Sequence, residues 1–303
     1  MSSLFCRHNR LTAKCPICSK EMEAELRAKA PPRPAGIRRA PVEARPRARR
    51  GGTSPRTGAL VTRKLARASD DGYRNPLVPG LRATADAERL AGALVIAAER
   101  IEPPGPYEVV ATEPNREQAS WLAFLLALIG PDVPERQDAL IASAPRFADG
   151  DVPELPPEHA RAVAAYRRWA ARAGSQAAGF TGEADWSPQR RFARVFERFA
   201  LPGLSRATRF ELLVTLGAAG VYELEPDQLQ LGAEGDATTH AAKRALLSGD
   251  KMLLERRSRD LAAACDVPLA ALDRGFALWD DPAADVELAE GPPAAMRSAL
   301  ALR

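Results

Sequence analysis

The chain has 303 residues, of which 46% are hydrophobic and 6% aromatic, and it contains 26 prolines. This length allows one or two domains, and the composition indicates a globular body joined to segments that do not fold. The net charge of +4 is uneven: residues 27–67 carry a surplus of +12, residues 1–26 carry +1, and residues 68–303 therefore carry −9. The positive net charge therefore comes from a basic arm attached to an acidic body, and the protein is not uniformly basic.

The apolar stretches are too short for a membrane protein. No apolar core typical of a signal peptide follows the first residues. The longest apolar run, WLAFLLALIG (121–130), has about half the length that a bilayer span needs. We therefore expect a cytoplasmic protein without a membrane partner, in which residues 121–130 form a buried helix.

Residues 1–23 contain three of the four cysteines. With one histidine they follow the pattern Cys6-x-His8-x6-Cys15-x2-Cys18. Four such side chains suit tetrahedral Zn²⁺, and the Cys-Pro-Ile-Cys turn brings two thiolates together. Because so short a segment has few apolar residues, metal binding would drive its folding. We predict a closed, structural zinc site; the alternative is a set of unrelated surface thiols.

Residues 24–72, here called the Arg-rich arm, hold eleven arginines and six prolines but no aromatic residue. Such a segment cannot bury enough apolar surface to offset the entropy of ordering, so we predict a disordered linker. Basic groups without interleaved aromatic rings suit attraction to the phosphate backbone of DNA and not base reading. A solubilising linker is the alternative.

Residues 73–303 show the apolar periodicity of an all-α domain. The expected helices span 84–101, 115–130, 157–174, 186–200, 205–217, 237–247, 251–264 and 268–279. Asn115 and Ser187 are the expected N-caps of two of them. Only YEVVAT (107–112) has the composition of a strand. Apolar patterns place four further side chains in the core: Trp186, Phe192, Cys265 and Trp279.

A Leu-Pro-Gly break at 201–203 separates two of these helices, which is the helix-hairpin-helix pattern. Hairpin amides and the positive end of the second helix dipole can converge on one phosphate. Gly203 lets a backbone approach closely, Ser205 can cap the second helix, and Arg206 and Arg209 add positive charge. A simple turn between two helices is the alternative.

The sequence after the hairpin resembles a known superfamily. One helix further on, the connector VYELEPDQLQLG (221–232) places Asp227 in a short loop before the next element. In this, residues 80–285 resemble the helix-hairpin-helix DNA glycosylases, which carry a catalytic aspartate about one helix and one loop after the hairpin. The resemblance implies that Asp227 is catalytic; an N-capping or turn aspartate is the alternative.

Two positions depart from the superfamily pattern. Ser205 replaces the second glycine of the hairpin, and Ala207 stands where bifunctional members carry a catalytic lysine. The resemblance therefore does not imply a lyase mechanism through a lysine Schiff base.

Within the superfamily, residues 190–280 are similar to clade 3 of the alpha-glutamyl/putrescinyl thymine pyrophosphorylases. The similarity lies in FALPGLSRATRFELLVTLG and in the run from DATTHAAKRALLSGD to ALDRGFALW. It implies hypermodification of DNA, in which an amine displaces pyrophosphate from an activated 5-hydroxymethyluracil.

That displacement needs a deprotonated amine, a stabilised methylene centre and a neutralised leaving group. Asp227 would accept the proton of the amine or stabilise the developing cation. The negative charge of the leaving pyrophosphate would be neutralised by His240, Lys243 and Arg244, which share one helix face. Arg206 near the hairpin would contribute as well. A solvated helix face is the alternative for this cluster, and a need for Mg²⁺ stays open.

The sequence is compatible with three functions. The leading hypothesis is displacement of pyrophosphate on an extruded, modified pyrimidine in DNA, because a base inside the duplex cannot reach a pocket. The second is a monofunctional glycosylase that excises a modified base with the help of Asp227. The third is a non-catalytic DNA-binding protein made of a zinc segment and a helix-hairpin-helix, in which Asp227→Asn leaves function intact.

Overall fold

The computed structural model describes residues 68–143, 145–150 and 155–302, and in these residues every regular element is a helix. This confirms the all-α class predicted for the body. The helices are α2 (Thr84–Ile101), α3 (Glu108–Thr112), α4 (Arg116–Ile129), α5 (Pro134–Ser143), η2 (Pro157–His159), α6 (Ala160–Ala173), α7 (Gln176–Thr181), α8 (Pro188–Arg198), α9 (Arg206–Ala218), α10 (Ala237–Leu246), α11 (Lys251–Cys265), α12 (Leu269–Asp280) and α13 (Ala294–Ala299).

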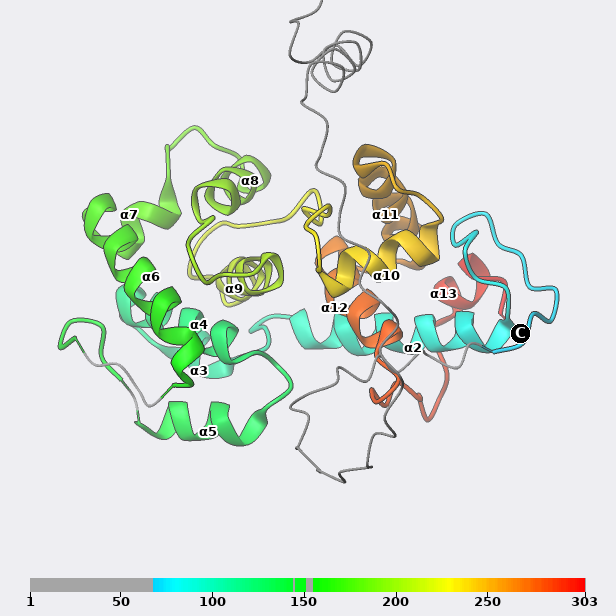
Figure 1. Ribbon diagram of the computed structural model, residues 1–303, viewed down its shortest axis with the longest axis horizontal. Coiled ribbons are helices and arrows are strands. Elements are labelled where there is room, and N and C mark those ends of the chain that lie inside the picture. The colour runs from blue at the N-terminus through cyan, green and yellow to red at the C-terminus, as the bar shows by residue number, and fades with distance from the viewer. Residues whose placement is uncertain (1–67, 144, 151–154, 303) are drawn as a thin grey trace, which may run out of the picture. The chain divides into compact units, whose positions relative to one another are not determined.

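The described helices form two lobes: in Figure 1, α3 to α9 lie toward the left, and α2 and α10 to α13 lie toward the right. In the terminal lobe, α2 packs against α12, and α10, α11 and α13 complete the group. In the central lobe, α3 to α9 pack around α4. The chain thus leaves the terminal lobe after α2 and returns to it at α10, so one lobe is inserted into the other in sequence.

Close helix packing holds the terminal lobe together. A Cβ atom on Gly275 of α12 would lie 2.6 Å from Cδ2 of Leu94 on α2, so a larger residue here would displace the Leu94 side chain. Leu90, Leu272 and Phe276 are fully buried beside it. Burial of each such side chain contributes about 1.5–3 kcal/mol relative to its exposure.

Aromatic rings fill the core of the central lobe. Phe124 of α4 stacks on Tyr166 of α6 with ring centroids 3.9 Å apart, and Trp121 lies 5.7 Å from the same tyrosine. Phe199, where α8 ends, meets Tyr166 edge-on at 5.7 Å. The last turn of α8 is therefore anchored in the core, which fixes where the following hairpin starts.

Local capping determines where the helices start. The side chain of Asn115 accepts hydrogen bonds from the backbone N–H groups of Glu117 and Gln118, and that of Ser187 accepts one from Arg190. Both predicted N-caps are confirmed. Trp186, Phe192, Cys265 and Trp279 are buried as expected. Burial raises the pKa of the Cys265 thiol from 9.0 to about 11, which suits an unreactive core thiol.

The strand expected at 107–112 is wrong, because this segment forms α3. The Val110 N–H donates to the Tyr107 carbonyl at 2.9 Å, so the segment meets its hydrogen bonds locally. No strand occurs in the described residues that could pair with it. The β-branched residues Val109 and Val110 therefore belong to a short helix that packs against α4, and they do not form a strand.

Among the helices of the described residues, none combines the length and the hydropathy that a bilayer span requires.

Candidate functional site: an acidic cleft beside the hairpin

The Leu-Pro-Gly break forms a tight turn between α8 and α9. The Leu204 N–H donates to the Leu201 carbonyl at 3.1 Å, and Gly203 has a φ of +88°. The Ser205 hydroxyl then accepts from the Thr208 N–H at 3.0 Å and caps α9. The predicted turn and cap are present, and the first amides of α9 follow the turn directly.

Gly203 also lies against another helix. A Cβ atom at this position would stand 3.0 Å from the backbone nitrogen and 3.2 Å from the Cβ of Ala162, in the first turn of α6. Gly203 itself is exposed. The glycine therefore serves two purposes, a left-handed backbone and a close approach of the hairpin to α6.

The two arginines of α9 occupy different environments. Arg209 is half-buried; its Nη1 donates to the Phe196 carbonyl at 3.0 Å, and its guanidinium lies 4.3 Å from the centroid of the Phe196 ring. Burial lowers the pKa of Arg209, and the charge of Arg206 adds to that shift. Arg209 thus ties α9 to the end of α8 beside the hairpin.

The placement of Arg206 corrects the role predicted for it. Its side chain is 1% exposed, and its Nη2 donates to Asp273 at 2.6 Å while its Nε lies 2.9 Å from Asp236. Its Nη1 donates to the Leu229 carbonyl at 2.8 Å. With its donors directed at two carboxylates and a carbonyl inside the protein, Arg206 has no free face for a phosphate. It joins α9 of the central lobe to α10 and α12 of the terminal lobe.

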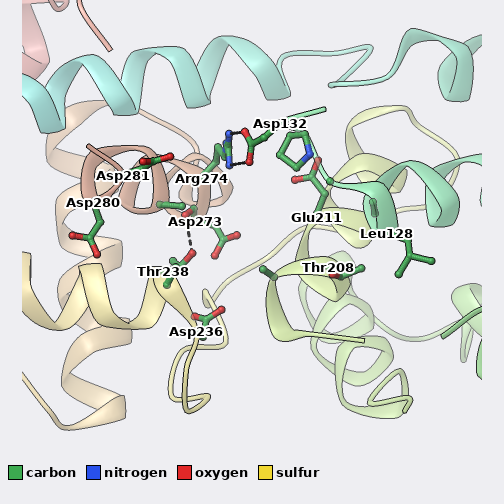
Figure 2. Close-up of a pocket in the computed structure, with 16 residues that line it drawn as sticks. Leu128, Asp132, Thr208, Glu211, Asp236, Thr238, Asp273, Arg274, Asp280 and Asp281 are labelled. Carbon is green, nitrogen blue, oxygen red and sulfur yellow. Dashed lines mark hydrogen bonds and ion pairs between the residues drawn. The ribbon is translucent and has the colours of Figure 1, made fainter. Parts of the chain in front are cut away.

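A cleft of about 480 Å³ opens between the lobes at this junction. Its walls come from the end of α4 and the loop after it, the first turns of α9 and α10, and the length of α12 (Figure 2). Six carboxylates and one arginine are among the lining residues: Asp132, Glu211, Asp236, Asp273, Asp280, Asp281 and Arg274. Ala207 and Thr208 also line it, so the cleft begins four residues after Gly203 of the hairpin.

None of the six lining carboxylates was predicted, and Asp236 is the one with a local sequence signal. It is the N-cap of α10, where it accepts from the Thr239 N–H at 2.8 Å and from the Thr239 hydroxyl at 2.6 Å. Its side chain is 8% exposed and lines the cleft. The sequence did indicate the capping role of Asp236, because an aspartate directly before the helix expected at 237 is a typical N-cap.

The two carboxylates on Arg206 have pKa values shifted in opposite directions. Burial alone would raise the pKa of Asp236, but the charge of Arg206 and the hydrogen bonds from Thr239 outweigh it and lower this pKa. For Asp273, burial dominates and raises the pKa, and Arg206 offsets only part of that shift. Of the pair, Asp236 is therefore the stronger acid, and Asp273 keeps its proton to a higher pH than an ordinary aspartate.

The other lining carboxylates are ion-paired except one. Glu211 pairs with Arg100 of α2, Asp132 with Arg274, and Asp280 with Arg244. Asp281 has no ion pair among the described residues, and its side chain accepts from the Ala283 N–H. Counting Arg206, four arginines face six carboxylates, so the cleft keeps a surplus of two acids.

Asp227 lies in the loop between α9 and α10, as expected, but outside the cleft. It is exposed, it sits in a bend of the connection between α9 and α10, and it is not among the residues that line the cleft. This placement separates Asp227 from the cleft, so its predicted catalytic role gains no support from the geometry.

Of the predicted cationic cluster on α10, only Arg244 contacts a carboxylate of the cleft. His240 is exposed and Lys243 is partly exposed, and neither lines the cleft. Arg244 is held by Asp280 and lies 4.6 Å from the ring centroid of Trp279. The structure therefore brings Gly203, Ser205 and Arg209 together at the hairpin but leaves His240 and Lys243 on the outer face of α10.

The zinc ligands predicted at Cys6, His8, Cys15 and Cys18 lie outside the described residues, as does most of the Arg-rich arm. In the described part of the chain, no group of three or more histidine, cysteine, aspartate or glutamate side chains is placed to hold a metal ion. The zinc site stays a prediction. We expect Cys15→Ser to abolish bound zinc, and unchanged zinc content would refute the assignment.

Comparison of the chain with protein-family models, with curated proteins and with solved structures found no match.

Proposed function

We propose that this chain is a helix-hairpin-helix enzyme that modifies an extruded pyrimidine in DNA, and that the cleft beside the hairpin receives the base. In the leading form of the proposal, an amine displaces pyrophosphate from an activated 5-hydroxymethyluracil, as in the thymine pyrophosphorylases that the sequence resembles. The observation that carries the proposal is the cleft carboxylate Asp236, which is buried and paired with Arg206 one residue before α10.

The size and position of the cleft support this proposal. A volume of about 480 Å³ lies within the range of small-molecule sites. The lining residues Ala207 and Thr208 belong to the first turn of α9, directly after the hairpin. A strand whose phosphate is bound at the hairpin could thus place an adjacent, extruded base in the cleft.

The carboxylates suit a reaction with an amine. A surplus of two acids in the cleft attracts a protonated amine and stabilises positive charge at the reacting carbon. In the reaction, the lone pair of the amine nitrogen forms a bond to the methylene carbon on C5 of the base. The carbon–oxygen bond breaks, its electron pair leaves with pyrophosphate, and Asp236 accepts the proton from the new ammonium group. Asp273, with its raised pKa, can pass a proton onward.

One observation favours the second candidate function, excision of a modified base. The one arginine that lines the cleft, Arg274, is paired with Asp132, and His240 and Lys243 lie elsewhere. A pyrophosphate leaving group therefore finds no free cation among the lining residues. Cleavage of the glycosidic bond places positive charge on the sugar, which Asp236 can stabilise, and it needs no such cation.

Product analysis separates these functions. The protein is incubated with DNA that carries pyrophosphorylated 5-hydroxymethyluracil and with a panel of amines, and the nucleosides are then identified by mass. A new amino-thymine supports displacement, and abasic sites support excision. DNA that stays intact with every amine, and also with other modified pyrimidines, overturns both and leaves a non-catalytic DNA-binding protein. The variant Asp236→Asn is run in parallel, because Asn caps helices as well as Asp.

A further inference from the structure

Positive charge gathers on one stretch of the central lobe. Residues 159–210, which run from η2 through α6, α7 and α8 to the first turns of α9, hold ten arginines and three acids, a surplus of +7. Because residues 68–303 carry −9 in total, the remainder of that body carries −16. The stretch that contains the hairpin therefore differs in sign from the body around it.

Three of these arginines lie in a line on α6. Arg161, Arg168 and Arg172 are exposed, whereas the opposite face of the helix is buried against the aromatic core. With 3.6 residues per turn, steps of seven and eleven residues return to within about 20° of the same direction. With a rise of about 1.5 Å per residue, the line is about 16 Å long.

The charges of this line are available to a ligand. Arg161, Arg168 and Arg172 form no hydrogen bond, ion pair or ring contact with other described residues. Arg167 on the same helix shows the contrast, because its guanidinium lies 4.7 Å from the ring centroid of Trp121. The line therefore carries three exposed positive charges that the fold itself does not use.

The line begins at the hairpin. Gly203 lies against the first turn of α6, with its virtual Cβ 3.0 Å from the Ala162 nitrogen, and Arg161 is the residue before Ala162. We propose that Arg161, Arg168 and Arg172 continue the hairpin as a contact surface for the phosphate backbone of one DNA strand. This inference rests on the proposed function in so far as DNA is the partner.

The geometry fits a nucleic-acid strand. Phosphates of one strand in duplex DNA follow each other at about 3.4 Å along the helix axis, so a line of about 16 Å passes about five of them. Long arginine side chains at three positions can reach two or three of those phosphates. Such contacts fix the position of the strand and carry no sequence information.

The test is the salt dependence of binding by the full chain to a fluorescent duplex of arbitrary sequence. The variant carries Arg161→Gln, Arg168→Gln and Arg172→Gln. The matched control removes three exposed, unpaired charges from the other lobe: Lys251→Gln, Arg256→Gln and Arg259→Gln. For wild-type protein, log K for DNA falls as log[salt] rises. We expect this slope to become less steep by about 2 to 3 in the α6 variant, at about 0.9 per lost phosphate contact. The control should keep the slope of the wild type.

Equal slopes for the α6 variant and the control would overturn the proposal. It would also be overturned if the α6 variant lost affinity for vesicles of phosphatidylserine and phosphatidylcholine but kept its slope on DNA. Thermal melting checks that both variants fold, which their exposed positions predict. Since binding is measured without turnover, this result is independent of whether the cleft catalyses a reaction.

Discussion

The hairpin stretch and the cleft lie next to each other but have opposite charge. The stretch 159–210 has a surplus of +7, whereas the cleft lining keeps two acids more than its ion pairs neutralise. In the first region, Arg161, Arg168 and Arg172 are exposed on α6 and Gly203 of the hairpin is exposed. In the second, arginines are used inward to hold carboxylates at fixed positions. Adjacent regions of opposite charge suit a ligand with an anionic backbone and a reacting group that develops positive charge.

The largest expected effect on stability comes from removing the buried arginine Arg206, which pairs with two aspartates of the cleft. Arg206→Met leaves Asp236 and Asp273 buried without their shared cation, and we expect a loss of about 3–5 kcal/mol in the free energy of unfolding. Arg209→Met is the matched control, because this half-buried side chain has one carbonyl partner at 3.0 Å and one ring; its loss should be about 1 kcal/mol. Chemical denaturation measures both. Equal losses would show that the buried ion cluster does not join the lobes.

A smaller effect concerns the backbone of the hairpin. Gly203→Ala meets a positive φ and a contact with Ala162, and it should cost about 1–3 kcal/mol. Gly220→Ala is the control, because Gly220 also has a positive φ, of +68°, but no atom within 4 Å of the added Cβ. Thermal unfolding of the two variants separates backbone strain from the close approach to α6. A Gly203→Ala protein as stable as Gly220→Ala would mean that the contact with α6 is easily relieved.

The smallest effect is the pH dependence of the two cleft aspartates. The pKa of Asp236 is lowered, so its stabilisation is present above the ordinary value of 3.8 and is lost as the pH falls through the lowered value. The pKa of Asp273 is raised, so stability is lost as the pH rises from 3.8 through the raised value. The Asp236→Asn variant should therefore be less stable than the wild type near neutral pH, and this difference in the free energy of unfolding should shrink in acid. The stability of the Asp273→Asn variant relative to the wild type should increase as the pH rises. Urea titrations between pH 3 and 7 measure the sign of these differences. Slopes of the same sign would contradict the assignment.

The sequence predicts local structure well here because caps and periodicity are local signals. The helix at 84–101 and the caps at Asn115, Ser187 and Ser205 agree with the structure. The segment 107–112 does not, because its two valines favour a strand only where a partner strand exists. Local preference cannot supply that partner.

The cleft could not be predicted in the same way. The lining residues come from α4, α9, α10 and α12, which are far apart in sequence, so only the packing of the lobes shows which loop faces inward. Asp227 and Asp236 are both loop aspartates that precede α10, and spacing alone chose the wrong one as the cleft residue. Arg206 likewise opens α9 as expected, but its long side chain turns into the protein toward two distant aspartates.

The most direct test of the account compares Asp236→Asn with Asp227→Asn in the product assay on modified DNA. Loss of a positioned acid–base group lowers the rate by about 10²- to 10⁴-fold, and we expect that loss for Asp236→Asn. Asp227→Asn should retain the rate of the wild type within about two-fold, because an exposed carboxylate outside the cleft takes no part in the reaction. The reverse result, an inactive Asp227→Asn protein beside a fully active Asp236→Asn protein, would contradict the assignment of the reaction to the cleft.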